Sequence, residues 1–219
     1  MSHRPFKNRL YAEFARVGTA LASDKRLELL DLLAQGPRYV DALAAETEMS
    51  VANISQHLQV LRAAKLVDAE REGNRVLYRL TDESVLRLWL DLRTVAEQHL
   101  PEIDQLVRQY AVDRADGEVS RVEMASLLES GGVILIDVRP AAEFKYGHIP
   151  GALPFPIEEL PQRLAELPKD KRIISYCRGT YCLFADEAVA LLRQEGFNAV
   201  RLKGGWPEWL AESLTRTAE

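Results

Sequence analysis

The sequence has few cysteines and no long apolar run, and each shortage excludes a class of protein. Its two cysteines, Cys177 and Cys182, lie in one short segment, so they cannot form the disulfide framework of a small secreted protein. No run of about 18 apolar residues could span a membrane, and no apolar stretch behind the basic N-terminus could serve as a signal-peptide core. We therefore expect a cytoplasmic protein with no membrane partner.

The charge is acidic overall but unevenly spread. The formal net charge is −5, yet residues 50–81 carry five basic residues against three acidic ones, which is a modest basic patch. A chain of 219 residues can form two domains of about 100 residues each. The polar, glycine-containing stretch 113–120 indicates the boundary. We predict domains at 1–112 and 119–219, joined by a linker at 113–118.

Helical periodicity and one hairpin dominate the first half. Leucines at helical spacing predict a helix from Ser23 and Asp24 to Gly36-Pro37, then a short helix at 39–46. Ser50 can cap a third helix, 51–65, whose apolar stripe we assign to Val51, Ile54, Leu58 and Leu61. Alternating residues around Gly73-Asn74 predict a hairpin, and a long helical pattern runs from Asp82 to about Tyr110 with a break at Pro101.

The second half has a different pattern. Short apolar runs at 133–138, 172–177 and 198–204 predict buried strands, and helical or loop patterns separate them. Strands that alternate with helices predict an α/β domain with a central, mainly parallel sheet.

Residues 50–67 follow the pattern S-x-x-x-I-S-x-H-L-x-x-L-x-x-A-x-L-V, and the basic hairpin comes directly after them. In this the chain resembles the recognition helix and wing of ArsR-type (arsenic-repressor-like) transcriptional regulators, over roughly residues 10–110. The resemblance implies an α+β winged helix-turn-helix domain that forms a homodimer through its first and last helices and binds a double-stranded, palindromic DNA operator.

Small polar side chains near a helix N-terminus can reach base edges, and arginines on a hairpin can contact phosphate or the minor groove. The expected DNA-binding residues are Ser50, Asn53, Ser55, Gln56, His57, Arg62, Arg71, Asn74 and Arg75. The alternative is that Gln56 and His57 lie on a solvated helix face of a domain that no longer binds DNA.

We expect neither a metal site nor a cofactor. ArsR-type metal sensors often use cysteine before the recognition helix, but residues 39–48 contain none. The last helix of the domain has one histidine, His99, and no Asp-x-His pair, which poorly supports a zinc site of nitrogen and oxygen ligands. The signal must therefore enter elsewhere.

Three further motifs occur in order: IDVRPAAEFKYGHIPGA at 136–152, ISYCRGTYC at 174–182 and LKGGWPEW at 202–209. Together they resemble a rhodanese domain from about residue 119 to 210. The resemblance implies that Cys177 is the nucleophile that becomes a persulfide, in a loop formed by Arg178, Gly179, Thr180 and Tyr181. It implies that Asp137 and Arg139 support the site, and we expect His148 to fix a loop or pack. Backbone amides and a helix N-terminus would stabilise the thiolate.

The chain departs from the rhodanese pattern in two ways. The loop usually ends in Arg or Lys where this chain has Cys182, and the helical stripe Ala188, Leu191 and Leu192 begins about two residues late. The sequence therefore does not fix the length of the loop. A longer loop would widen the pocket, so oxyanion substrates also stay open. Losing the basic residue weakens the case for ordinary thiosulfate turnover.

A second thiol permits other chemistry, because Cys182 could attack a persulfide on Cys177 as a resolving thiol. The alternatives are that Cys182 is a buried structural residue beside a single reactive Cys177, or that the domain is inert. Our first hypothesis is a DNA-binding repressor that senses reactive sulfur or redox state through the cysteine pair, with small sulfur species or a sulfur-donor protein as partners. The rivals are a sulfurtransferase that uses thiosulfate or a persulfide and, less favoured, an arsenate- or oxyanion-linked regulator or reductase.

Overall fold

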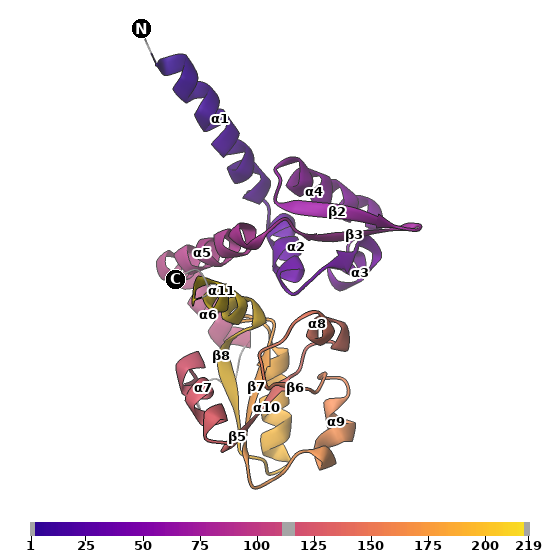
Figure 1. Cartoon of the computed structure of the whole chain (residues 1–219), viewed down its shortest axis with the longest axis vertical. Helices are drawn as coiled ribbons and strands as arrows, with labels where there is room; N and C mark the ends of the chain where they lie inside the picture. The colour runs from indigo at the N-terminus through magenta and orange to yellow at the C-terminus, as the bar shows by residue number, and fades with distance from the viewer. Residues whose placement is uncertain (1–2, 111–116, 217–219) are drawn as a thin grey trace. The chain divides into compact units, whose positions relative to one another are not determined.

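The computed structural model describes residues 3–110 and 117–216. The chain forms two compact units, residues 1–91 and 92–219, and each is described by itself below. Figure 1 shows the helices and strands of both units along the chain. Helix α5 (Glu83–His99) begins in the first unit and ends in the second. None of the helices in the described part of the chain is long and apolar enough to span a membrane.

The first unit is a helical domain with a small antiparallel sheet. Its helices and strands before α5 are α1 (Arg4–Leu21), α2 (Asp24–Ala34), β1 (Arg38–Tyr39), α3 (Val40–Glu46), α4 (Val51–Ala63), β2 (Val67–Glu72) and β3 (Arg75–Leu80). The sheet order is β1-β3-β2, with β2 and β3 joined by a tight turn at Gly73-Asn74. This helix, helix, hairpin order is the predicted winged helix-turn-helix.

Local sequence explains where α4 begins and which face it buries. The Ser50 hydroxyl accepts a hydrogen bond from the Asn53 N–H at 3.2 Å, which caps the helix as expected. Ile54, Leu58 and Leu61 are fully buried in the core of the unit. Val51, which we assigned to the same stripe, is 53% exposed because it lies in the first turn, beyond the edge of that core.

The second unit is built on a five-stranded parallel sheet of order β4-β8-β7-β5-β6. It contains the end of α5 and then α6 (Pro101–Tyr110), β4 (Glu118–Val119), α7 (Arg121–Glu129), β5 (Val133–Asp137), α8 (Ala141–Tyr146), β6 (Leu153–Pro154), α9 (Leu160–Arg163), the 3₁₀ turn η2 (Leu164–Glu166), β7 (Arg172–Cys177), α10 (Phe184–Gln194), β8 (Ala199–Gly205) and α11 (Trp206–Arg216). The α/β class expected from the apolar runs is confirmed.

Each face of this sheet has its own apolar core. Residues of α9 and α10, with Leu192 and Phe197, pack on one face, and residues of α7 and α11, with Met124 and Trp206, pack on the other. Because the strands are parallel, the ends of β5 and β7 lie at the same sheet edge, which places the segments after Asp137 and Cys177 near each other.

The three long strands of this sheet were predicted, but the two-residue strands β1, β4 and β6 were not, since two residues carry no periodicity. The break at Pro101 is confirmed, because α6 starts there. Residues 113–116 of the predicted linker lie outside the described residues, and Glu118 already belongs to β4. The division at 112 stays a prediction; residues 92–110 pack with the second unit.

Candidate functional site

Cys177 and Cys182 are joined by a disulfide across a short loop between β7 and α10. Cys177 is the last residue of β7 and is buried, whereas Cys182 is partly buried and lies two residues before α10 begins at Phe184. The Cys182 N–H also donates to the Gly179 carbonyl at 3.3 Å. The four intervening residues that we predicted as the loop, Arg178 to Tyr181, do connect these two positions. Helix α10 follows the loop, so the partial positive charge of its N-terminus lies at the end of the loop.

A buried arginine that the sequence analysis missed holds this loop from β8. The Nη2 atom of Arg201 donates to the carbonyls of Gly179 at 2.8 Å and Thr180 at 2.9 Å. Its Nη1 atom pairs with the Asp186 carboxylate at 3.2 Å, and Arg201 is only 4% exposed. Arg201 is one of two charged residues in the apolar run 198–204, and its place between Val200 and Leu202 was the available signal, because a buried charge requires partners.

The backbone of the loop also passes very close to β8. A Cβ atom on Gly205 would lie 2.2 Å from the Cys177 carbonyl oxygen and 2.6 Å from the Gly179 nitrogen. Gly179 itself has a φ of 150°, which favours glycine. The Gly205 N–H donates to Glu208 at 2.9 Å, so the start of α11 is tied to the same place.

The side chain of Arg178 reaches towards α8. Its guanidinium donates to the buried carboxylate of Glu143, with Nε 3.0 Å from Oε1. Arg178 is thus a structural anchor of the loop in this disulfide form. Glu143 lies within the motif 136–152, but sequence reasoning did not single it out.

Asp137 and Arg139, which we expected to support the site, form a fully buried ion pair. The Tyr176 hydroxyl donates to Asp137 at 2.6 Å and accepts from the Ile149 N–H at 3.1 Å. Burial and the neighbouring Asp137 carboxylate raise the pKa of Tyr176 well above its ordinary value. These residues contact the strand that ends at Cys177.

The motif 136–152 is fixed by two more contacts. Arg139 donates to the Gly147 carbonyl at 2.7 Å. His148 lies 2.9 Å from the Phe144 carbonyl through Nδ1 and stacks on the Phe144 ring at a centroid distance of 3.8 Å. These contacts match the packing role that we expected of His148.

Tyr181 connects the loop to the C-terminal half of α5 within the second unit. Its side chain is hydrogen-bonded to Glu97, and burial together with this bond raises the pKa of Tyr181. Arg93 of α5 lies 5.5 Å from the Tyr181 ring centroid and forms an ion pair with Glu208. A pocket of about 360 Å³ lies beside these residues and includes Thr180 and Lys203 in its lining.

The expected base-reading residues lie on α4. Asn53, Gln56 and Arg62 are exposed, whereas Ser55 and His57 are partly buried. The Ser55 hydroxyl donates to the Val51 carbonyl at 2.7 Å, so it is occupied by its own helix in this DNA-free form. The exposed face of α4 thus presents amide groups and one cation.

The wing carries the other expected DNA contacts, and Arg71, Asn74 and Arg75 are all exposed. Arg71 donates to the Gly73 carbonyl at 3.2 Å and so braces the turn. Arg75 donates to both oxygens of Asp41, at 2.9 and 3.0 Å, and covers the Tyr39 ring. The hydrogen bond from Arg75 lowers the pKa of Asp41. The wing is thereby braced against the start of α3.

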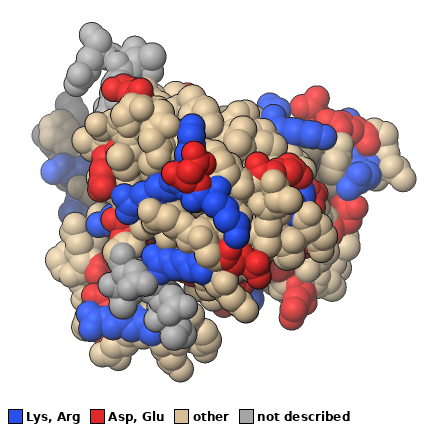
Figure 2. All heavy atoms as spheres, turned by 90° about the horizontal axis from the view of Figure 1, so that it is seen from below, with Lys and Arg blue, Asp and Glu red and all other residues tan. Residues whose placement is uncertain are grey.

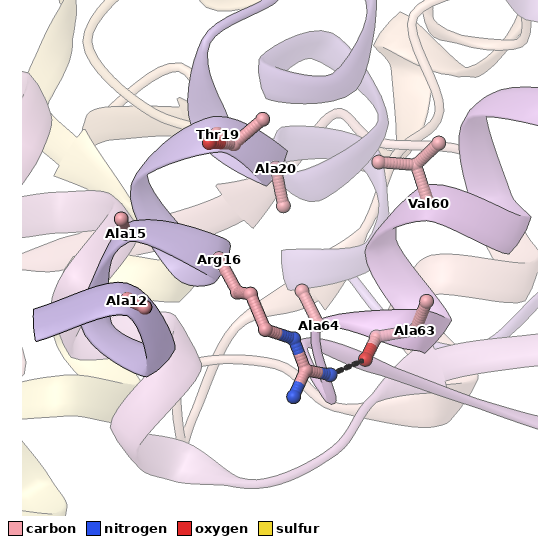
Figure 3. A pocket seen from close by; sticks show the side chains of 8 residues that line it. All are labelled: Ala12, Ala15, Arg16, Thr19, Ala20, Val60, Ala63 and Ala64. Atoms are coloured by element: carbon pink, nitrogen blue, oxygen red, sulfur yellow. Dashed lines mark hydrogen bonds between the residues drawn. The ribbon is translucent and has the colours of Figure 1, made fainter. Parts of the chain in front are cut away.

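Helix α1 is attached to the end of α4 beside an open pocket of about 360 Å³ (Figure 3). Small side chains such as Ala12 and Ala15 line this pocket, and Arg16 reaches across it to the Ala63 carbonyl at 2.7 Å. That bond satisfies a carbonyl at the helix end. A movement of α1 would therefore act directly on the helix that we expect to read DNA.

Acidic and basic side chains are interspersed on the face drawn in Figure 2, in keeping with the small net charge. The expected DNA-binding residues are therefore distinguished by their place on α4 and the wing, not by a large patch of one charge. Within residues 3–110 and 117–216, no three His, Cys, Asp or Glu side chains gather as metal ligands would.

The fold and the loop define a class: a winged helix-turn-helix domain followed by a rhodanese-like domain with a cysteine at the end of its central strand. Residues 23–69 match the family described as bacterial regulatory protein, arsR family, and residues 120–212 match the rhodanese-like domain. The chain is 44% identical to the HTH-type transcriptional regulator Rv0324 of Mycobacterium tuberculosis, over 95% of this chain and 92% of that protein. The chain belongs to the ArsR family of transcriptional regulators and carries a rhodanese-like domain.

Two further similarities each cover one domain. The C-terminal part is 37% identical to a protein named sulfurtransferase from Allochromatium vinosum, over 40% of this chain and 81% of that protein. The N-terminal part is 47% identical to the homodimeric winged helix-turn-helix DNA-binding domain Mb0332 of Mycobacterium bovis, solved by NMR, with a TM-score of 0.43 over 46% of this chain and 91% of that one.

Proposed function

We propose that this protein is a dimeric cytoplasmic repressor whose affinity for a palindromic operator depends on the sulfur or redox state of Cys177 and Cys182. The observation that carries the proposal is that the two cysteines are close enough to form a disulfide in the loop after β7. A thiol pair at this position can register an oxidant or sulfane sulfur by a change of covalent state.

The DNA-binding half of the proposal rests on α4 and the wing. Asn53 and Gln56 present amide groups that can read adenine in the major groove, and Arg62, Arg71 and Arg75 are exposed cations for phosphate. Arg75 would exchange Asp41 for a phosphate oxygen on binding. These contacts position the helix in the groove and give the binding its dependence on salt.

The dimeric state is supported by apolar side chains that the described chain leaves exposed on α1. Phe6, Tyr11 and Phe14 are each at least 60% exposed, and the Tyr11 and Phe14 rings pack edge to face on each other. A surface of this kind favours burial against a second copy. We therefore place α1 in the homodimer interface, as the ArsR resemblance implies for the first helix.

The sulfur chemistry balances without an additional oxidant. The Cys177 thiolate attacks the outer sulfur of a donor persulfide, R–S–SH, which gives Cys177–S–SH and releases R–SH. The Cys182 thiol then attacks the inner sulfur of that persulfide, forms the Cys177–Cys182 disulfide and releases H₂S. The two thiols lose two electrons, and the sulfane sulfur accepts them.

The change in the loop would reach α5 through Tyr181, the residue beside Cys182. Its hydrogen bond to Glu97 joins the loop to a helix that begins at Glu83 in the first unit. Closing or opening the disulfide alters the backbone on which Tyr181 sits. We infer that this contact couples the sulfur state to the DNA-binding domain.

Mass spectrometry of the intact full-length protein tests the sulfur step. Reduced protein treated with inorganic polysulfide should lose two hydrogens and carry a Cys177–Cys182 disulfide in its peptide map. Cys182→Ser should instead retain one added sulfur on Cys177, and Cys177→Ser should show neither product. Wild-type protein that stays a dithiol would contradict the proposal.

The second candidate is a sulfurtransferase, and the rhodanese-like loop around Cys177 favours it. In that case Cys177 would pass its outer sulfur to an acceptor such as cyanide and return to the thiolate, while Cys182 would be dispensable. Steady-state turnover with thiosulfate that is retained in Cys182→Ser and lost in Cys177→Ala would support this enzyme. Turnover absent from both wild type and Cys182→Ser would argue against it.

A further inference from the structure

Arg201 is a buried charged residue of the second unit, and its guanidinium binds the loop between Cys177 and Cys182. It is 4% exposed, on strand β8, and its Nη2 atom donates to the Gly179 and Thr180 carbonyls at 2.8 and 2.9 Å. The same atom lies 3.5 Å from the Cys182 carbonyl. Three of the six residues from Cys177 to Cys182 therefore direct their carbonyls at one guanidinium.

Acidic partners keep this guanidinium in place. Asp186, in the first turn of α10, lies 3.2 Å from Nη1, and Glu118 of β4 lies 3.6 Å from it. An arginine is always charged and its donors form a rigid planar fork, so a buried one fixes its acceptors in direction as well as distance. Arg201 thus joins the loop, the helix after it and the edge strand β4.

The direction of these carbonyls determines the direction of the amides. In a trans peptide the C=O and the following N–H point opposite ways, so the N–H groups of Thr180 and Tyr181 point away from Arg201. In the disulfide form the sulfur–sulfur bond also closes the loop. In the dithiol form that covalent closure is absent, so the loop has to be held by non-covalent contacts such as the hydrogen bonds to Arg201.

We propose that Arg201 is the positioning residue that keeps the 177–182 loop in its closed shape in the dithiol protein, and so sets the reactivity of Cys177 and the ease of disulfide formation with Cys182. This inference rests on the proposed function, because it requires Cys177 and Cys182 to react with each other. A loop held in shape keeps the two sulfurs at high effective concentration and keeps the loop amides in one orientation, in which they can stabilise a thiolate.

The test measures two properties of the full-length protein. The first is the dithiol–disulfide equilibrium of the pair against reduced and oxidised glutathione. The second is the alkylation rate of Cys177 by iodoacetamide in a Cys182→Ser background. Arg201→Gln removes the charge and the forked donor, and Arg201→Lys restores the charge alone. Arg193→Gln is the matched control, because Arg193 also donates to a backbone carbonyl, that of Ala199 at 2.9 Å, away from the loop.

We expect Arg201→Gln to lower the equilibrium constant for disulfide formation and the alkylation rate about tenfold each. Arg201→Lys should recover part of both losses, and Arg193→Gln should leave both within about twofold of wild type. A folded Arg201→Gln protein that matches Arg193→Gln in both measurements would overturn the inference. If Arg201→Gln does not fold, Arg201→Lys takes its place, and a match between Arg201→Lys and Arg193→Gln in both measurements would overturn the inference.

Hydrogen exchange in the wild type supplies a test that needs no variant. The Cys182 amide, which donates to the Gly179 carbonyl that Arg201 also binds, should remain protected after reduction of the disulfide, and exchange at the rate of an unfolded peptide would overturn the role of Arg201. Failure of the proposed function has a different signature: the thiols would respond to Arg201 substitutions while operator affinity stayed the same in dithiol and disulfide protein.

Discussion

The side chain of Tyr181 is hydrogen-bonded to Glu97, so the residue beside Cys182 is attached to the end of α5. Tyr181 is 38% exposed, and the partial loss of solvent around its hydroxyl together with this bond raises its pKa, so the hydroxyl stays protonated at neutral pH. Arg93, on the same helix, forms an ion pair with Glu97 at 3.4 Å and keeps the carboxylate in position. In this contact the neutral Tyr181 hydroxyl is the donor, and the Glu97 carboxylate, held by Arg93, is the acceptor.

Tyr181→Phe should weaken the coupling without abolishing DNA binding, because it removes only the hydroxyl. Allosteric couplings are typically 5–150-fold in affinity. We expect polysulfide to change operator affinity about tenfold in wild type and about threefold or less in Tyr181→Phe, measured by fluorescence anisotropy. Tyr146→Phe, at an exposed tyrosine on α8, is the control and should respond as wild type does. A full response in Tyr181→Phe would refute this route.

Arg75→Ala should reduce the salt dependence of DNA binding. If Arg75 contacts one phosphate, the slope of log affinity against log salt concentration should become shallower by about 1. Asp41→Asn should strengthen binding, because it releases Arg75 from its ion pair. Lys145→Ala, at an exposed lysine of the second unit, should leave the slope unchanged. An unaltered slope in Arg75→Ala would place the wing away from the DNA backbone.

Tyr176→Phe should destabilise the second unit by about 1–3 kcal/mol at pH 7, because Asp137 and the Ile149 N–H both lose a buried hydrogen-bond partner. The folded state raises the pKa of Tyr176, so this stability is complete below the unfolded pKa of about 10 and declines as the pH rises above it. Urea unfolding should therefore show the gap between wild type and variant narrowing above pH 10. A gap that widens there would contradict the assignment.

Gly205→Ala should destabilise the second unit by about 1–3 kcal/mol or more, since the new methyl group would overlap the Cys177 carbonyl. It should also slow disulfide formation, because the loop must move. Gly132→Ala is a matched control: its Cβ would lie 3.5 Å from the nearest atom, the Ser130 hydroxyl oxygen. Equal unfolding midpoints for the two variants would show that the loop adapts freely.

Much of the fold could be predicted from the sequence because periodicity reports burial. The cap at Ser50, the turn at Gly73-Asn74 and the apolar runs of β5, β7 and β8 all appear in the structure. Val51 was placed wrongly in the apolar stripe because spacing alone does not show where the core ends. The strand β4 was missed because its two residues carry no periodicity, and only its pairing with a strand about 80 residues away along the chain defines it.

The sequence analysis named the two cysteines of the candidate site, but it missed several residues that hold the loop between them. Cys177 and Cys182 were identified together, since their spacing is local. Arg201 and Glu208 act on the loop from segments that follow it by about 20 residues or more, and only the parallel pairing of β7 with β8 brings them there. Arg178 was assigned to the loop, but its pairing with Glu143 depends on the packing of α8.

The central claim is that the state of the cysteine pair sets operator affinity. The most direct measurement compares affinity for the operator before and after polysulfide treatment, in wild type and in Cys177→Ser. The account predicts a change of about tenfold in wild type and none in Cys177→Ser. Equal affinity in all four cases would contradict it.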